Sequence, residues 1–190
     1  MTSAPSARDD ASLVAAALAG ESRAFTDLMR RHKEPIYRFI RRYVGDADEA
    51  YDLTQETFVA AWSGLNKYDS IRPLPTWLRR IALNKCRDWS RRRQVRRFFF
   101  RAEPIDAVAE RIITREEAPD LEQDLRLSNL DRAIAALPAQ LKEPLLLTQF
   151  DGLSHQAVAK ALGLTAKTVE TRVYRAKRAL IQAMRRRDEG

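Results

Sequence analysis

Apolar residues recur every three or four positions through most of the chain, which is the spacing of one face of an α-helix. No segment keeps the strict alternation of apolar and polar residues that is typical of a half-buried strand. The pattern therefore predicts an all-α fold. The expected helices span residues 10–19, 21–44, 46–63, 76–93 or beyond, 123–137, 139–150, 154–162 and 166–187.

Capping and helix-breaking residues set the limits of these helices. Pro35 is expected to break or kink the segment 21–44, with helix on either side, because proline removes a backbone donor. Asp46 resembles an N-cap with Glu49 in the third helical position, as in a capping box. Thr76 is expected to cap the following long helix.

The expected helices fall into two groups that are separated by a different kind of sequence. Residues 98–121 mix phenylalanine, proline and acidic residues without a sustained period, which is typical of a linker, and one short helix is expected near 108–113. We therefore expect two small helical domains, residues 1–97 and 122–190, joined by a flexible linker.

The composition supports this interpretation and excludes other classes of protein. Of the 190 residues, 45% are hydrophobic, which is enough to build buried cores and argues against general disorder. The small numbers of glycines (6) and prolines (8) disfavour a turn-rich β-sandwich. The single cysteine, Cys86, excludes an internal disulfide framework and a cysteine-based zinc site within one chain, so we expect no cofactor.

The sequence also lacks the signals of membrane insertion and secretion. No stretch approaches the roughly 18 apolar residues of a transmembrane helix. The first residues do not combine a basic start with an apolar run, as a secretory signal would. We therefore expect no membrane insertion and a cytoplasmic location.

The charge of the chain is both large and unevenly distributed. The formal net charge of +8 suggests a polyanionic partner, either nucleic acid or an anionic membrane. Residues 66–101 and 151–190 are basic, whereas residues 102–131 between them are acidic. A solvated surface usually mixes the two signs, so this separation favours two binding modules on a tether.

The expected helix 46–63 has two contrasting faces. One side gathers the small and apolar residues Ala50, Leu53, Thr57, Phe58 and Ala61. The other gathers Asp48, Asp52, Gln55 and Glu56, with Val59 among them. The acidic face could dock a basic partner helix, but it could equally be a solvated face with one stray valine.

The expected helix that follows carries a basic stripe opposite its apolar side. Arg80, Asn84, Arg87 and Arg91 line up at helical spacing. Guanidinium groups in a row bind phosphates, and an amide among them can read a base edge. Almost no acidic residues are available in 66–101 to pair with these arginines, so the stripe favours nucleic acid over an ordinary charged surface.

The loop before this helix offers polar and aromatic side chains: Asn66, Lys67, Tyr68 and Asp69. Such a loop beside a basic helix suits an unpaired base, which can be stacked and hydrogen-bonded. Tyr68 could equally pack on the core. The three tryptophans, Trp62, Trp77 and Trp89, fall on or near apolar sides and are expected to be mainly core.

The last two helices fit a helix-turn-helix. Ser154 and Thr165 can cap them, and Gly163 suits the turn between them. The buried stripe of the second helix is expected to be Val169, Val173, Ala176 and Leu180. Its outer face presents Lys167, Thr171, Tyr174, Arg175 and Arg178, with Glu170 on the edge, which suits a recognition helix in the major groove.

Three side chains of this helix have specific DNA chemistry. Arg175 could reach guanine O6 and N7, and Glu170 could accept from cytosine N4. Thr168, at the N-terminal end, could hold a phosphate through its hydroxyl and nearby backbone N–H groups. An ordinary helical hairpin with a solvated face remains an alternative.

Three segments together resemble the extracytoplasmic-function sigma factors of bacterial RNA polymerase. They are DADEAYDLTQETFVAAW (46–62), WLRRIALNKCRDWSRRR (77–93) and LPAQLKEPLLLTQFDGLSHQAVAKALGLTAKTVETRVYRAKRAL (137–180). The similarity covers about residues 10–97 and 123–187, in the same order. The helix-turn-helix alone would be shared with many regulators, whereas the set of three is specific.

The resemblance implies a role for each surface. The first domain would be a sigma-2 helical bundle that docks on the β′ clamp helices of core polymerase through Asp48, Asp52, Gln55, Glu56 and Val59. It would recognise and help melt the −10 promoter element through Asn66, Lys67, Tyr68, Arg80, Asn84, Arg87 and Arg91. The second would be a sigma-4 domain that touches the β-flap and reads the −35 element through Lys167, Thr168, Glu170, Thr171, Arg172, Tyr174, Arg175 and Arg178. Such proteins are commonly held inactive by an anti-sigma factor.

The chain departs from the family pattern at three places. Glu170 stands where many members have lysine or arginine, which bears on the −35 sequence preference. Leu74, flanked by prolines, replaces the phenylalanine common at that position, which bears on the path of the loop. The run Phe98–Phe100 is not part of the pattern and has no assigned role.

Two other functions were weighed against the sigma-factor interpretation. A stand-alone helix-turn-helix regulator would bind a duplex operator, but it leaves the acidic helix beside a basic stripe unexplained. An enzyme is disfavoured, because His32 and His155 are distant in sequence and the chain lacks the HExxH, P-loop and GxSxG motifs.

Overall fold

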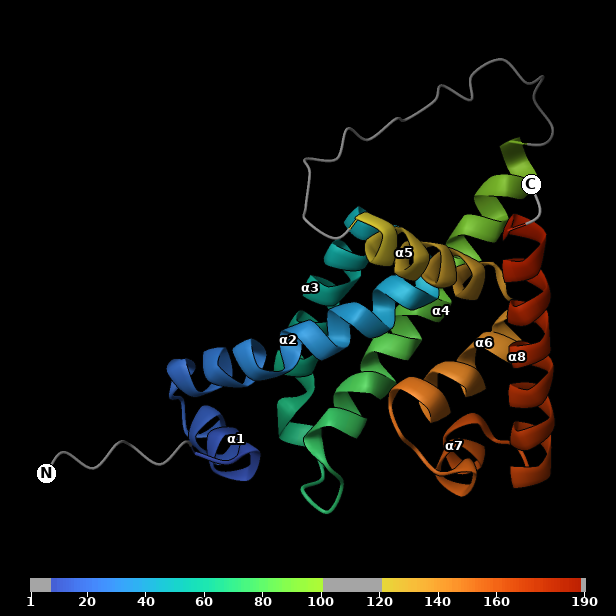
Figure 1. Ribbon diagram of the computed structural model, residues 1–190. Coiled ribbons are helices and arrows are strands. Elements are labelled where there is room, and N and C mark those ends of the chain that lie inside the picture. The colour runs from blue at the N-terminus through green and yellow to red at the C-terminus, as the bar shows by residue number, and fades with distance from the viewer. Residues whose placement is uncertain (1–7, 101–120, 189–190) are drawn as a thin grey trace, which may run out of the picture. The chain divides into compact units, whose positions relative to one another are not determined.

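The structure is a computed structural model that describes residues 8–100 and 121–188, with side chains over 8–96 and 129–185 (Figure 1). In these ranges the secondary structure is entirely helical, which confirms the all-α prediction. The elements are α1 (Asp10–Leu18), α2 (Ser22–Val44), α3 (Ala47–Gly64), the 3₁₀ turn η1 (Leu65–Lys67), α4 (Leu74–Phe100), α5 (Leu121–Ala136), α6 (Ala139–Leu145), the π-turn η2 (Leu146–Phe150), α7 (His155–Leu162) and α8 (Ala166–Asp188). No helix of the described ranges combines the length and the apolar content that crossing a membrane requires.

The chain divides into two compact units, each of which has its own buried core. The first unit takes in the described residues of Met1–Arg41 and Asp46–Arg87. The second takes in those of Arg42–Gly45 and Asp88–Gly190.

In the first unit, α1 is fixed to α2 through the carboxylate of Asp10. One oxygen of this carboxylate accepts from Arg31 at 2.6 Å, and the other lies 2.9 Å from His32 Nε2. Asp9 caps α1, because its Oδ1 accepts from the backbone N–H of Ser12 at 2.8 Å. The pairing satisfies the buried His32 ring and orients α1.

Helix α2 is one helix that includes Pro35, so of the break or kink predicted at this proline the break is wrong. Proline removes one backbone hydrogen bond, a local cost that packing can offset. Leu28 before the proline and Phe39 and Ile40 after it are all buried. The helix is therefore continuous because its apolar face is buried on both sides of Pro35.

Helix α3 begins as its sequence predicts. Asp46 is the N-cap, and its Oδ1 accepts from the backbone N–H of Glu49 at 3.0 Å. The buried face includes two threonines, Thr54 and Thr57, whose hydroxyls each donate to the carbonyl four residues earlier at 2.7 Å. These bonds let polar side chains lie in the core without unsatisfied groups.

Helix α4 begins at Leu74, two residues before the expected start, and ends at Phe100, which agrees with a helix that reaches residue 93 or beyond. The carbonyl of Pro73 accepts from the N–H groups of Thr76 and Trp77 at 3.0 and 3.3 Å, which places Thr76 inside the first turn and not at the cap. A proline in that turn is tolerated, because the N–H it lacks would have no helical partner there. The last turn takes in Phe98–Phe100, which we had expected to belong to the linker. Residues 101–120, including the short helix expected near 108–113, lie outside the described residues.

The second unit is organised around α8, which packs against α5, α6 and α7. Its core contains Ile134, Leu146, Val158, Val169 and Ala176, all fully buried. The helix predicted over 139–150 is instead α6 followed by the π-turn η2, in which the N–H of Asp151 donates to the carbonyl of Leu146 at 3.2 Å.

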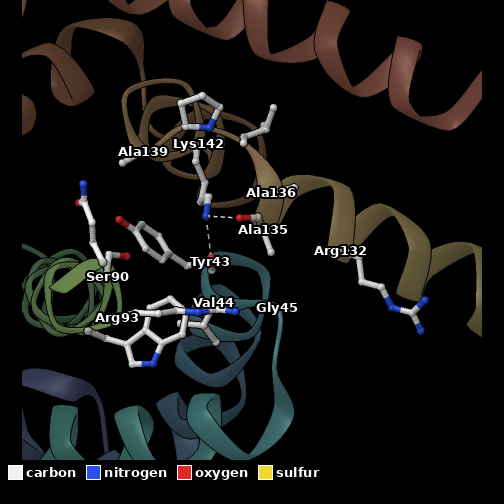
Figure 2. Close-up of a pocket in the computed structure, with 14 residues that line it drawn as sticks. Tyr43, Val44, Gly45, Ser90, Arg93, Arg132, Ala135, Ala136, Ala139 and Lys142 are labelled. Atoms are coloured by element: carbon white, nitrogen blue, oxygen red, sulfur yellow. Dashed lines mark hydrogen bonds between the residues drawn. The ribbon is translucent and has the colours of Figure 1, made fainter. Parts of the chain in front are cut away.

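The same unit buries a lysine against the end of α2. Lys142 Nζ donates to the backbone carbonyls of Tyr43 at 2.9 Å and of Ala135 at 2.6 Å, as Figure 2 shows. The ammonium also lies 4.7 Å from the centre of the Tyr43 ring. The hydroxyl of Tyr43 donates to Glu143 Oε1 at 3.3 Å. These contacts satisfy a buried charge that would otherwise be costly.

The cap of α3 can be tested by substitution. Asp46→Ala should lower the free energy of unfolding by about 1 kcal/mol, because the N–H of Glu49 loses its acceptor. Asp46→Asn is the matched control, since the amide oxygen can still accept. Urea denaturation followed by tryptophan fluorescence measures the change, with a signal from Trp62 and Trp77 of the first unit and from Trp89 of the second. Equal loss of stability in both variants would contradict the assignment of the cap.

Candidate functional site

One side of α3 forms an exposed acidic row. Asp48, Asp52 and Gln55 are exposed, and Val59 beside them has 66% of its surface accessible. Glu56 differs from the others, because it is half-buried and its carboxylate lies 3.1 Å from Lys85 Nζ of α4. The charge of Glu56 is therefore partly compensated within the unit, whereas the carboxylates of Asp48 and Asp52 face solvent.

Trp62 continues this row, although the sequence had indicated that it belongs mainly to the core. Its side chain is 46% exposed and packs edge-on against Phe25 of α2, with the ring centres 4.8 Å apart. The sequence spacing could have indicated this exposure. Val59 follows Gln55 by four residues and Trp62 follows Val59 by three, so all three lie on the same side of the helix. We name this exposed row the α3 ridge: Asp48, Asp52, Gln55, Val59 and Trp62.

The α3 ridge has the spacing of a helix that pairs with another helix. Steps of four, three, four and three residues keep a row on one side of the helix, as in a coiled coil. Asp48 and Asp52 make one end acidic, and Val59 and Trp62 make the other end apolar. A partner helix that fits this row would be basic at one end and apolar at the other.

The basic stripe on α4 is only partly free for an external anion. Arg80 and Asn84 are exposed, and Arg87 is half-buried. Arg91 is exposed but forms an ion pair with Asp88 on the preceding turn. Exposed pairs of this kind contribute little to stability, so a phosphate can replace Asp88 at small cost.

The loop before α4 separates into exposed and packed residues. Asn66 and Lys67, on η1, are exposed, so their side chains are accessible to a nucleic acid. The Tyr68 ring instead tilts against Trp77 at 5.2 Å between centres, and its hydroxyl donates to the carbonyl of Arg72 at 2.5 Å. Burial and the nearby Asp10 carboxylate raise the pKa of Tyr68, so its hydroxyl stays protonated as a donor. Of the two roles considered for Tyr68, packing is the one that its contacts favour.

The second unit contains the predicted helix-turn-helix. Ser154 Oγ accepts from the N–H of Ala157 at 3.2 Å, and Thr165 Oγ1 accepts from the N–H of Thr168 at 3.1 Å. Gly163 ends α7 with a φ of 67°, a left-handed conformation that favours glycine. Both caps and the turn were predicted from the sequence. In the expected buried stripe, Val169, Val173 and Ala176 are buried, whereas Leu180 is only half-buried.

The outer face of α8 presents most of the residues proposed to bind DNA. Those fully exposed are Lys167, Glu170, Thr171, Tyr174, Arg175 and Arg178. Thr168 and Arg172 are half-buried. The N–H of Thr168 serves the cap, and its hydroxyl lies 2.8 Å from that of Thr165, so these groups are already bonded in the free protein.

Glu170 is held by a neighbour on its own helix. Lys167 Nζ lies 2.9 Å from Glu170 Oε2, and this hydrogen bond lowers the pKa of the Glu170 carboxyl. The carboxylate is therefore ionised and can act only as an acceptor. Because Lys167 contacts only Oε2, Oε1 can still accept from a donor on DNA, such as cytosine N4.

Comparisons with known proteins agree with both units. The model of Sigma-70 region 2 matches residues 28–96, and that of Sigma-70, region 4 matches residues 127–180. The chain is 36% identical to RNA polymerase sigma factor NccH of Alcaligenes xylosoxydans xylosoxydans, over 90% of this chain and 92% of that protein. It is 30% identical to ECF RNA polymerase sigma factor SigW of Bacillus subtilis, over 87% of this chain and 91% of that protein.

Two solved structures are similar in fold. The structure of CnrH in complex with the cytosolic domain of CnrY matches 92% of this chain and 96% of that chain, with a TM-score of 0.65 and 30% identity. The sigma factor RpoE of Bartonella quintana, in complex with the anti-sigma factor NepR, has a TM-score of 0.65 at 23% identity and covers 85% of this chain and 96% of that chain. The second similarity supports the fold alone.

The basic stripe makes a prediction about salt dependence. Arg80→Ala should weaken binding to a mixed-sequence single-stranded oligonucleotide and reduce the slope of log affinity against log salt by about 0.7, because one phosphate contact is lost. Fluorescence anisotropy over a salt series measures both quantities. Arg38→Ala is the control, since Arg38 is exposed on α2 and paired with Glu34. If the two variants share one slope, Arg80 does not contact phosphate.

Proposed function

The chain belongs to the extracytoplasmic-function sigma factors of the sigma-70 family. We propose that each surface described above binds a different partner of such a factor: core polymerase, the −10 element or the −35 element. The protein binds core RNA polymerase and directs transcription initiation at specific promoters. The observation that carries the assignment of surfaces is that the α3 ridge and the basic stripe lie on neighbouring helices of the chain, while a helix-turn-helix occupies the second unit. A stand-alone regulator would have no use for the α3 ridge.

In our proposal, the α3 ridge is the polymerase-binding surface and receives one of the β′ clamp helices. The exposed carboxylates of Asp48 and Asp52 pair with basic side chains of that helix, and Val59 and Trp62 bury apolar surface at the other end. Tryptophan at an interface can contribute a large share of the binding energy because it buries a large rigid ring. Glu56 is already paired with Lys85 of α4, so it adds little net charge to the interface. Its role in the proposal is to hold α3 against α4.

The basic stripe and the loop before α4 are proposed to engage the −10 element. Arg80, Arg87 and Arg91 would hold phosphates, and the exposed amide of Asn84 would read a base edge between them. Asn66 and Lys67 would contact the strand that leaves the duplex. The division of labour follows from chemistry, since guanidinium groups position the backbone and an amide distinguishes bases.

The outer face of α8 is proposed to read the −35 element from the major groove. Arg175 would donate to guanine, and Glu170 would accept from cytosine through the carboxylate oxygen that Lys167 does not contact. Thr168 and Arg172 would contribute from the half-buried edge, and Lys167, Thr171, Tyr174 and Arg178 from the exposed face. The body of this domain would touch the β-flap.

The functional domains are proposed to be residues 1–97 and 122–190, with a connector over 98–121. We further propose control by an anti-sigma factor. Support comes from the similar structure at 30% identity, in which CnrH is bound to the cytosolic domain of CnrY. Because RNA polymerase is the partner, the protein would act in the cytoplasm. We propose no catalytic step and no cofactor for the chain itself, since its family acts in transcription initiation.

Reversing one charge of the α3 ridge should separate polymerase binding from the fold. Asp52→Arg should lower the affinity for core polymerase at least about tenfold, because like charges would then face each other across the interface. Competition against a labelled wild-type protein for core polymerase measures the loss. Glu34→Arg, an equally exposed reversal on α2, should leave the affinity unchanged. Equal affinity of Asp52→Arg and wild type would remove the α3 ridge from the interface.

The assignment of Glu170 concerns sequence preference alone. Glu170→Lys should change the base preferred in the −35 element, because a donor replaces an acceptor, with an expected discrimination of about 1–3 kcal/mol at that base pair. Transcription by reconstituted holoenzyme from a library randomised at −35 measures the preference, and binding to core polymerase should not change. Glu170→Gln tests whether the charge is needed. An unaltered base ranking in both variants would exclude Glu170 from readout.

A further inference from the structure

The loop before α4 carries the most exposed large apolar side chain of the described residues. Ile71 has 89% of its surface accessible, more than Val59, Tyr174 or Ile181. A single exposed apolar residue is ordinary on a protein surface. Its position at the apex of a turn is less ordinary, because turn apices favour glycine, asparagine, aspartate and serine over bulky β-branched residues.

This turn is held by several hydrogen bonds. The N–H of Arg72 donates to the carbonyl of Asp69 at 3.1 Å, which closes the turn around Ser70 and Ile71. The Asp69 side chain accepts from the N–H of Ile71 at 3.0 Å. The hydroxyl of Tyr68 donates to the carbonyl of Arg72 at 2.5 Å, and its ring rests against Trp77. The apex is therefore presented on a preformed support, which reduces the entropy lost when it binds.

Tyr68, the aromatic residue of this loop, is half-buried and packs partly within the unit. Tyr68 was the residue considered for stacking, but its ring and hydroxyl are both engaged within the unit. Ile71 is the large aliphatic side chain of this loop that is exposed to solvent. The exposed polar residues of η1, Asn66 and Lys67, precede the turn, and Arg80 on α4 follows it.

From these observations we propose that Ile71 is an apolar wedge that packs on the face of an unpaired base in the melted −10 element. The inference rests on the proposed function and deepens it by naming the side chain that contacts the base face. A base in a duplex has both faces stacked, so this contact forms only after the strands separate. Isoleucine is among the side chains that proteins insert against unstacked base steps.

The wedge has a thermodynamic consequence. A contact made only in the open state shifts the equilibrium between closed and open promoter by its own free energy. Ile71 should therefore favour melting without strengthening the initial binding to duplex DNA. Asn84 differs in this respect, since an amide can bond to the edge of a paired base.

The test compares wild type, Ile71→Ala, Ile71→Leu and the matched control Ile181→Ala in reconstituted holoenzyme. Each is assayed on a promoter that the wild-type holoenzyme transcribes. Permanganate reactivity of thymines in the −10 element reports opening, and binding at low temperature reports the closed complex. Because both isoleucines are more than half exposed, alanine at either position should not disturb folding.

Ile71→Ala should reduce opening about tenfold and leave closed-complex binding unchanged. The substitution removes the burial of one aliphatic side chain against the base, and this burial exists only in the open complex. Ile71→Leu and Ile181→Ala should open the promoter as the wild type does. Opening by Ile71→Ala equal to that of the wild type, or an equal loss in the closed complex, would overturn the wedge. If the wild-type holoenzyme itself opened no promoter, the proposed function would fail, which is a distinguishable result.

Discussion

The burial of one face of each helix is the constraint on which the functional surfaces depend. In α3, Ala50, Leu53 and Phe58 are buried, and this fixes the rotation of the helix so that Asp52 and Val59 face solvent. In α8, burial of Val169, Val173 and Ala176 directs Arg175 outward in the same way. The buried side chains thus orient the binding side chains, which are not themselves part of the core. The surface residues can therefore be substituted without changing the core.

The acidic side chains of α3 and the basic side chains of α4 are linked by an ion pair between the two helices. The carboxylates of α3 and the guanidinium groups of α4 belong to one stretch of chain, and Lys85 joins the two helices by its ion pair with Glu56. This pair compensates the charge of Glu56, which contacts α4. Asp48 and Asp52 remain exposed for an external partner, and Arg80 remains exposed for DNA. The distribution explains how one small unit can present an acidic surface to a protein and a basic surface to a nucleic acid.

The local features of the fold could be predicted from the sequence, and the exceptions have physical causes. The caps at Asp46, Ser154 and Thr165 were correct, because a cap depends on residues within one turn. Pro35 was expected to interrupt α2, but tertiary burial on both sides overrides a local penalty. The exposure of Trp62 and the packing of Tyr68 depend on Phe25 and Trp77, which are far away in sequence or lie across a turn. Helical spacing alone cannot tell which aromatic residues find such partners.

The account makes the chain a promoter-specificity subunit, and transcription of whole genomic DNA by core polymerase tests this most directly. Transcript 5′ ends would be sequenced with and without the purified, inhibitor-free protein, using genomic DNA of the source bacterium. The account predicts a small set of new start sites, each preceded by two shared sequence elements near −35 and −10. If the added protein produced no new start sites, while the same polymerase responded to another sigma factor, the central claim would be contradicted.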